Sequence, residues 1–105
     1  MPIDLDRLLK EMTRAAGGVL ATESRRARTA IAGVLADQKE AIAAIVAARL
    51  AGEIDDAEVR VQLQSERLAF RSGLAMARVA GKSAAQKAAN AAFAVLVKTL
   101  RAAVL

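Results

Sequence analysis

Apolar residues recur at the three- and four-residue spacing of an amphipathic helix from the start of the chain. The first series is Leu5, Leu8, Leu9 and Met12. Asp4 precedes it and is the type of residue that caps a helix N-terminus, because its carboxylate accepts hydrogen bonds from free backbone N–H groups. The pattern predicts a helix that begins at about residue 4.

The same spacing continues through the first half of the chain. It passes Gly17 and Gly18, where we expect the helix to weaken or end, and resumes at Ala27, Ile31, Val34, Leu35, Ile42, Ile45, Val46 and Leu50. Gly52 suits the position just after a helix C-terminus, where glycine adopts a left-handed backbone conformation at little cost. The pattern therefore predicts a first helical half at about residues 4–51 and a turn at 52–56.

The second half opens with Asp55 and Glu58, whose spacing predicts a capping box. The stripe that follows is nearly heptad and consists of Val59, Leu63, Phe70, Leu74, Ala77, Gly81, Ala84, Ala88, Ala91 and Val95. Ser83 and Gln86, next to Gly81, form a second capping-box pattern. The second helical half, about residues 56–104, therefore either breaks near Gly81 or runs through it.

These elements predict an all-α protein with a single domain over residues 1–105. The expected architecture is an antiparallel helical hairpin of two long alanine-rich helices. Breaks near Gly17-Gly18 and near Gly81 would convert this hairpin into a three- or four-helix bundle.

Charged residues are placed so that they could pair across such a hairpin. Antiparallel packing about the turn would bring together Glu58 and Arg49, Arg67 and Glu40, and Arg71 and Asp37. Exposed pairs of this kind contribute only about 0–1 kcal/mol each, so we expect them to select the register more than to stabilise the fold.

Composition indicates close helix packing over a thin core. The chain of 105 residues is 55% hydrophobic but only 2% aromatic, and alanine is by far the most common of the apolar residues. Alanine favours helices but buries little area. Small residues at every fourth position would let two backbones approach closely, and these are Gly73, Ala77, Gly81, Ala85 and Ala89. The predicted helix-packing interface is Leu63, Phe70, Gly73, Leu74, Ala77, Gly81, Ala88 and Val95.

The last stretch, residues 84–105, is apolar around most of its circumference. A helix of this kind has to bury more than one face. We rank association with other chains first, folding back within the same chain second, and a position on a membrane surface third.

The basic residues raise a different possibility. The net charge is +5, and Arg60, Arg67, Arg71 and Arg78 would form one line on a continuous helix. With a second cluster, Arg25, Arg26 and Arg28, they are candidates for binding an anion. No aromatic residue accompanies either cluster for base stacking. We favour the simpler interpretation, in which Arg67 and Arg71 pair across the hairpin and the others are solvated.

The absence of two residue types narrows the chemistry. The chain has no cysteine and no histidine, and therefore neither a thiolate nucleophile nor the usual general base near neutral pH. No spacing suggests a catalytic group, a metal site, a cofactor or a small-molecule substrate. We expect a protein that is not an enzyme. The N-terminus lacks the basic and apolar regions of a secretory signal, so cytoplasmic residence is the expectation.

The sequence thus predicts a nonenzymatic, self-associating helical structural or interaction protein that assembles through apolar, small-residue-rich helix faces. Its partner would be a second copy or another helical protein. The alternative is a basic helical module that binds nucleic acid or another anionic surface, such as a membrane, electrostatically. Neither of these anionic partners is favoured.

Overall fold

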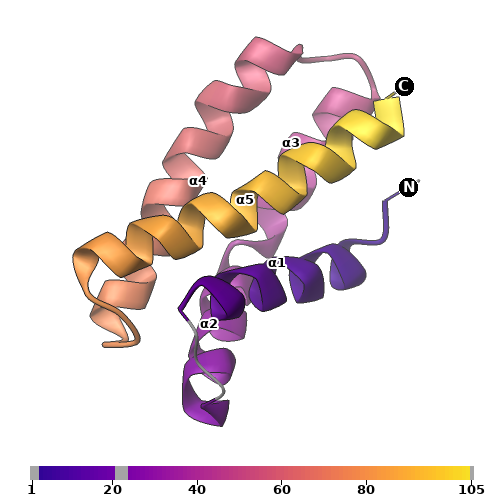
Figure 1. Cartoon of the computed structure of the whole chain (residues 1–105). Helices are drawn as coiled ribbons and strands as arrows, with labels where there is room; N and C mark the ends of the chain where they lie inside the picture. Colours follow the sequence, from indigo (N-terminus) through magenta and orange to yellow (C-terminus); the bar gives the residue numbers. More distant parts are fainter. Residues whose placement is uncertain (1–2, 21–23, 105) are drawn as a thin grey trace.

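The computed structural model describes residues 3–20 and 24–104, and within these ranges the chain is all-helical (Figure 1). Its described elements are the helices α1 (Leu5–Val19), α2 (Arg25–Asp37), α3 (Lys39–Leu50), α4 (Asp56–Met76) and α5 (Lys82–Val104). The predicted all-α class is confirmed. The expected pair of two long helices is replaced by five shorter ones.

Three of the predicted helix ends are confirmed. The Asp4 side chain caps α1 by accepting a hydrogen bond from the Arg7 N–H at 3.2 Å. Asp55 and Glu58 form the capping box of α4, with distances of 2.8 Å and 3.2 Å. Gly52 follows α3 with a φ of 76°, and the N–H groups of Gly52 and Glu53 bond to carbonyls in its last turn. This is the Schellman pattern, in which glycine meets no steric penalty.

The expected break near Gly17-Gly18 is confirmed, because α1 ends at Val19, although both glycines still lie within its last turn. A glycine costs only about 1 kcal/mol in a helix interior. Burial of Leu8, Met12 and Ala16 holds this helix against the rest of the bundle.

The chain also breaks near Gly81, but the cause differs from the one expected. α4 ends at Met76, and the chain turns at Arg78, which has a φ of 58°. α5 begins at Lys82, so Ser83 lies inside its first turn and is not the N-cap. The Gln86 side chain bonds to Arg71 and to Asn90 instead of closing a capping box.

A further break at Gln38 separates α2 from α3. The Gln38 side chain is buried, and its Nε2 donates a hydrogen bond to the Glu66 carbonyl oxygen in α4 at 2.7 Å. Its Oε1 is buried without a partner among the described residues. This contact ties the bend in the first half of the chain to the middle of α4.

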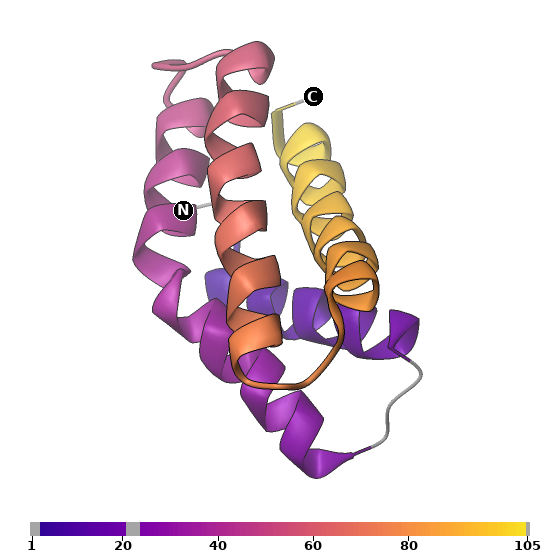
Figure 2. The same cartoon turned by 90° about the vertical axis from the view of Figure 1, so that its left-hand side faces the viewer.

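The helices form a compact bundle with α5 in contact with α1 on one side and α4 on the other. Figure 2 shows α4 between α3 and α5 at the front of the molecule, with α1 crossing behind them. The residues Ala85, Ala88, Ala89 and Ala92 have no exposed surface, and alanine at these positions lets the neighbouring helices approach closely. Folding back within the chain, which we ranked second, is therefore what covers α5.

Aromatic and glycine contacts hold α4 in this arrangement. The rings of Phe70 and Phe93 meet edge to face, with centroids 6.0 Å apart. On the other side of α4, Gly73 lies so close to Val34 that an added Cβ would stand 2.7 Å from a valine methyl carbon. α4 thus has one side against α5, one against α2 and α3, and a third side that no other helix covers.

Candidate functional site

The residues of the predicted helix-packing interface do not share one face. Leu63, Phe70, Leu74 and Ala88 are buried in the core, and Val95 is partly buried. Gly73 provides the close contact with α2, whereas Ala77 and Gly81 lie exposed in the turn between α4 and α5. The expected small-residue stripe is therefore interrupted at that turn, and only Ala85 and Ala89 continue it inside the core.

The ion pairs expected across the hairpin do not form. Arg49 binds Asp56 at 2.9 Å rather than Glu58, and Arg71 donates to the Gln86 side chain at 2.8 Å rather than to Asp37. Within the described ranges, Arg67 and Glu40 make no salt bridge. Exposed ion pairs are too weak to set the packing, so the core residues determine which charges meet.

The predicted line of four arginines is shortened to three. Arg60, Arg67 and Arg71 lie on α4, and the contact of Arg71 with Gln86 places this line on the side of α4 that faces α5. Arg78 leaves the line, because the helix ends before it and its backbone is left-handed.

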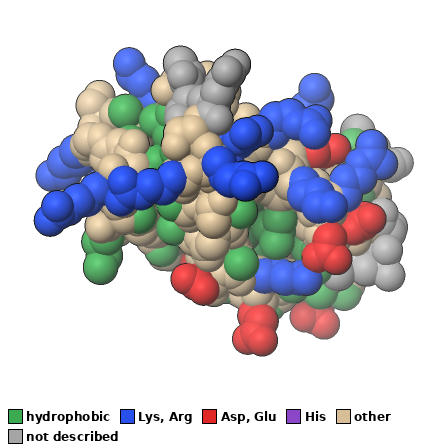
Figure 3. Space-filling model, turned by 90° about the horizontal axis from the view of Figure 1, so that it is seen from below, with side chains coloured by type: hydrophobic (Ala, Val, Ile, Leu, Met, Phe, Trp, Pro, Cys, Tyr) green, Lys and Arg blue, Asp and Glu red, His purple; other side chains and the backbone are tan. Residues whose placement is uncertain are grey.

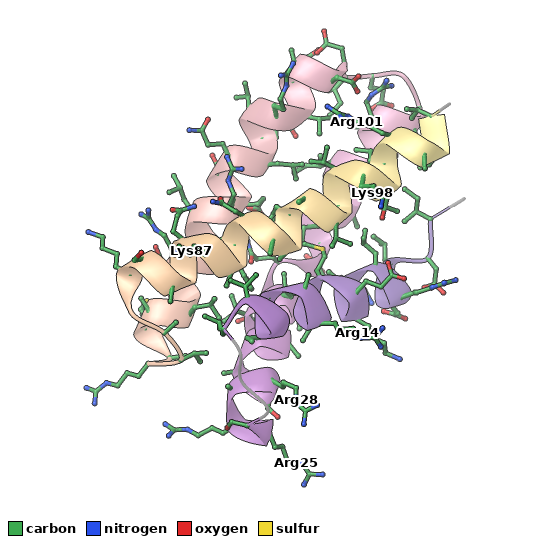
Figure 4. The ribbon with its side chains drawn as sticks, viewed as in Figure 1. Arg14, Arg25, Arg28, Lys87, Lys98 and Arg101 are labelled. Carbon is green, nitrogen blue, oxygen red and sulfur yellow. The ribbon has the colours of Figure 1, made fainter. Side chains whose placement is uncertain are left out.

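Arg78 instead joins a basic end of the molecule. Arg26, at the start of α2, lines one side of a cavity of about 240 Å³, and Arg78 and Val79 line the other. Arg25 and Arg28 lie at the same end of α2, and Lys87 lies near the start of α5 (Figure 4). Seen from below, lysine and arginine side chains extend over much of the surface (Figure 3). We call this region, consisting of Arg25, Arg26, Arg28 and Arg78, the basic end.

The basic end arises from uneven placement of acids along the chain. No aspartate or glutamate follows Glu66, and none lies in the first turn of α2. Positive charges at a helix N-terminus interact unfavourably with the helix dipole, so the dipole does not account for the arginines there. The acidic residues Glu53, Asp55, Asp56 and Glu58 gather at the opposite end of α4, around the turn after α3.

The uncovered side of α4 carries a second candidate surface. At about 100° per residue, Val61, Ser65, Leu68 and Ser72 lie within roughly 60° of one another and opposite the buried Leu63. Val61 is 68% exposed, Leu68 44% and the nearby Met76 84%. We call this surface, consisting of Val61, Ser65, Leu68, Ser72, Ala75 and Met76, the α4 outer face.

Charge is missing from the α4 outer face. The three ionisable residues between Val61 and Met76 are Glu66, Arg67 and Arg71, which are partly buried and lie about 90° or more around the helix from the centre of this face. The solvent side of a bundle helix normally carries charged and polar residues. This uncharged stripe is visible in the sequence, because Val61, Ser65, Leu68, Ser72 and Ala75 follow one another at alternating spacings of four and three residues. It was missed because the buried stripe on the same helix has larger apolar residues.

Among the described residues, the remaining surface shows no candidate reactive group. A hollow of about 460 Å³ lies between the start of α1 and the end of α5, but its charged side chains serve α1 itself. Asp4 caps that helix, and Arg7 pairs with Glu11 at 3.3 Å. Within residues 3–20 and 24–104, no group of three or more acidic side chains is arranged to hold a metal ion.

The resolved pKa shifts have simple causes in exposed ion pairs. The hydrogen bond and charge of Lys39 lower the pKa of the Asp6 carboxyl, and Asp6 in turn raises the pKa of Lys39, across a distance of 2.8 Å. Arg49 lowers the pKa of Asp56 in the same way, with smaller contributions from Arg101 and Arg60. Both arrangements are surface pairs of the kind that link helices, rather than sites with a buried reactive acid or base.

No helix among the described residues is long and apolar enough to cross a membrane. No family model matches the chain, and neither a curated protein nor a solved structure matches it. The two candidate functional surfaces are the α4 outer face and the basic end.

Proposed function

We propose that this protein is a nonenzymatic helical interaction protein that self-associates through the α4 outer face. The observation that carries the proposal is a charge-free face with Val61, Leu68 and Met76 exposed in one row along the uncovered side of α4. Exposed apolar residues are ordinary when scattered singly, but a row of them with helical spacing is typical of an interaction surface.

This surface differs from the one that the sequence suggested. Residues 84–105 were expected to drive association, but in the structure α1 and α4 cover the buried side of α5. The α4 outer face spans about 22 Å from Val61 to Met76 at 1.5 Å per residue. Its serines and alanines leave room for the side chains of a second helix, which favours helix-to-helix packing over contact with a flat surface.

The proposal is tested by placing a charge in the centre of the face. Leu68→Glu should weaken self-association by about tenfold or more, because the carboxylate would be desolvated at the contact. The fold should persist, since Leu68 is exposed. Sedimentation equilibrium gives the association constant, and circular dichroism checks the helical content.

Ala44→Glu is the matched control. It adds the same charge at an exposed position of α3 and should leave the association constant within about twofold of the parent value. Equal association of the parent and Leu68→Glu would refute the α4 outer face as the contact.

The basic end supports a second candidate function, which is electrostatic binding of an anionic surface such as nucleic acid. Arg25, Arg26 and Arg28 lie at the start of α2, and Arg26 and Arg78 border the same cavity. Phosphate contacts release counterions, so affinity for mixed-sequence DNA should fall steeply between about 50 and 200 mM salt. Fluorescence anisotropy measures this slope.

A charge-matched comparison separates specific use of this end from general attraction to a basic protein. Arg25→Gln with Arg26→Gln should reduce the salt slope by about 2, because each phosphate contact contributes roughly one unit. Arg7→Gln with Arg101→Gln removes the same charge elsewhere and should leave the slope nearly unchanged. No binding at low salt, or equal losses in the two double variants, would remove this candidate.

A further inference from the structure

The α4 outer face has a regular alternation of large and small side chains. The large residues Val61 and Leu68 are seven residues apart, and the small residues Ser65 and Ser72 lie between and after them with the same spacing. A seven-residue repeat of this kind allows side chains to enter the gaps of a facing helix. Each large residue then needs a small residue opposite it.

Among the ways of pairing two copies, an antiparallel one provides this match at each large residue. If Val61 faces Ser72 of a second copy, the helical rise places Leu68 opposite Ser65 and Met76 opposite Ala57. A parallel pair in register would put Val61 on Val61 and Ser72 on Ser72, which gives alternating crowded and empty layers. We infer that α4 packs antiparallel against α4 of a second copy, with Val61 opposite Ser72.

Charge at the ends of α4 favours the same direction. The N-terminal end of the helix has Glu53, Asp55 and Glu58, which make no salt bridge among the described residues. The C-terminal end leads into Arg78 and Lys82. In the antiparallel pair, Arg78 of each copy lies close to Asp55 of the other, whereas a parallel pair would bring like charges together at both ends.

This inference rests on the proposed self-association but adds its direction and register, which single cysteines can measure separately. The chain has no cysteine of its own, so each introduced thiol reports one position. We would prepare Val61→Cys, Ser72→Cys and Ser65→Cys, oxidise each variant alone and in mixtures, and identify the disulfide-linked pairs by mass spectrometry.

The expected result is a mixed disulfide between Val61→Cys and Ser72→Cys, at least fivefold more abundant than a disulfide of either variant with itself. Two copies of Ser72→Cys would lie about 16 Å apart along the helix axis in this register, which is beyond disulfide reach. Ser65→Cys lies near the twofold axis and should form a disulfide with its own copy whether the two α4 helices are antiparallel or parallel. It therefore reports contact between the two α4 helices, whatever their direction.

The outcomes separate the inference from the proposed function. Self-linked Val61→Cys and Ser72→Cys, without the mixed product, would overturn the antiparallel register and leave self-association standing. A dimeric mass with no disulfide from any variant would place the contact elsewhere and also overturn the inference. A monomeric mass for the parent at every concentration would overturn both.

Discussion

At the scale of single residues, two turns show how backbone conformation sets local stability. Gly52 and Arg78 occupy equivalent positions after α3 and α4, with φ values of 76° and 58°, and each turn closes with the same pair of backbone hydrogen bonds. Glycine is at ease there, but a residue with a Cβ costs about 1–2 kcal/mol. Arg78 therefore holds a strained position while adding a charge to the basic end.

Replacement of Arg78 tests this strain. Arg78→Gly should raise the free energy of unfolding by about 1 kcal/mol, because it relieves the left-handed conformation. Arg78→Ala should be nearly silent, since alanine keeps the strain and the arginine makes no salt bridge among the described residues. Urea denaturation measures both. A loss of stability in Arg78→Gly would show that the side chain supports the turn.

Gly73 should resist a substitution that usually stabilises helices. Alanine gains about 1 kcal/mol over glycine in a helix interior, but at Gly73 its Cβ would stand 2.7 Å and 3.1 Å from the two methyl carbons of Val34. Valine has little rotamer freedom in a helix, so relief of the clash requires a shift of α2. We expect a net loss of about 1 kcal/mol for Gly73→Ala.

Two variants isolate the cause of that loss. Gly33→Ala, at an exposed position with nothing within 4 Å, should stabilise the protein by about 0.5–1 kcal/mol. Gly73→Ala made together with Val34→Ala should recover most of the helix-propensity gain. If Gly73→Ala raises the free energy of unfolding as much as Gly33→Ala does, the helices α2 and α4 leave room for a Cβ at residue 73, and the close contact with Val34 is refuted.

At the scale of helices, the sequence predicted ends that depend on local chemistry and missed those that depend on packing. Asp4, Gly52 and Asp55 act through their own backbone neighbours, and their roles were correctly predicted. The break at Gln38 has neither glycine nor proline beside it. Its physical context is the hydrogen bond to the Glu66 carbonyl of α4, which no pattern within α2 or α3 reveals.

The link between α1 and α3 should give a pH dependence of defined sign. The pKa of Asp6 is lowered from 3.8 by Lys39, so its contribution to stability is present above 3.8 and is lost as pH falls through the lower folded value. The pKa of Lys39 is raised from 10.5, so its contribution is present below 10.5 and is lost as pH rises through the higher folded value.

Lys39→Met should remove both dependences at once. Compared with the parent, its free energy of unfolding should differ by a constant amount between about pH 5 and 9, and the difference should shrink at both extremes. Because both side chains are exposed, the difference should be small and should decrease with added salt. Urea denaturation across pH measures it. A difference that grows on acidification would contradict the assignment.

At the scale of the whole molecule, composition and periodicity sufficed for the all-α class but not for the arrangement. Residues 84–105 are apolar around most of the helix, so they have to be buried against other helices. The spacing of the alanines could not show whether α1, α4 or another chain provides that contact. The candidate surface was missed for a related reason. Val61 and Leu68 belong to a helix whose buried stripe is stronger, so their exposure became evident only when the neighbours of α4 were placed.

The proposed dimer forms through the apolar α4 outer face, and charge at the two ends of α4 sets the relative direction of the two copies. The most direct test is absolute mass by light scattering after size exclusion, over a concentration series and at two salt concentrations. We expect a monomer–dimer equilibrium that weakens only modestly in high salt, because the central contact is apolar. A monomeric mass at every concentration would contradict self-association, and a dimer abolished by salt would contradict the role of the apolar face.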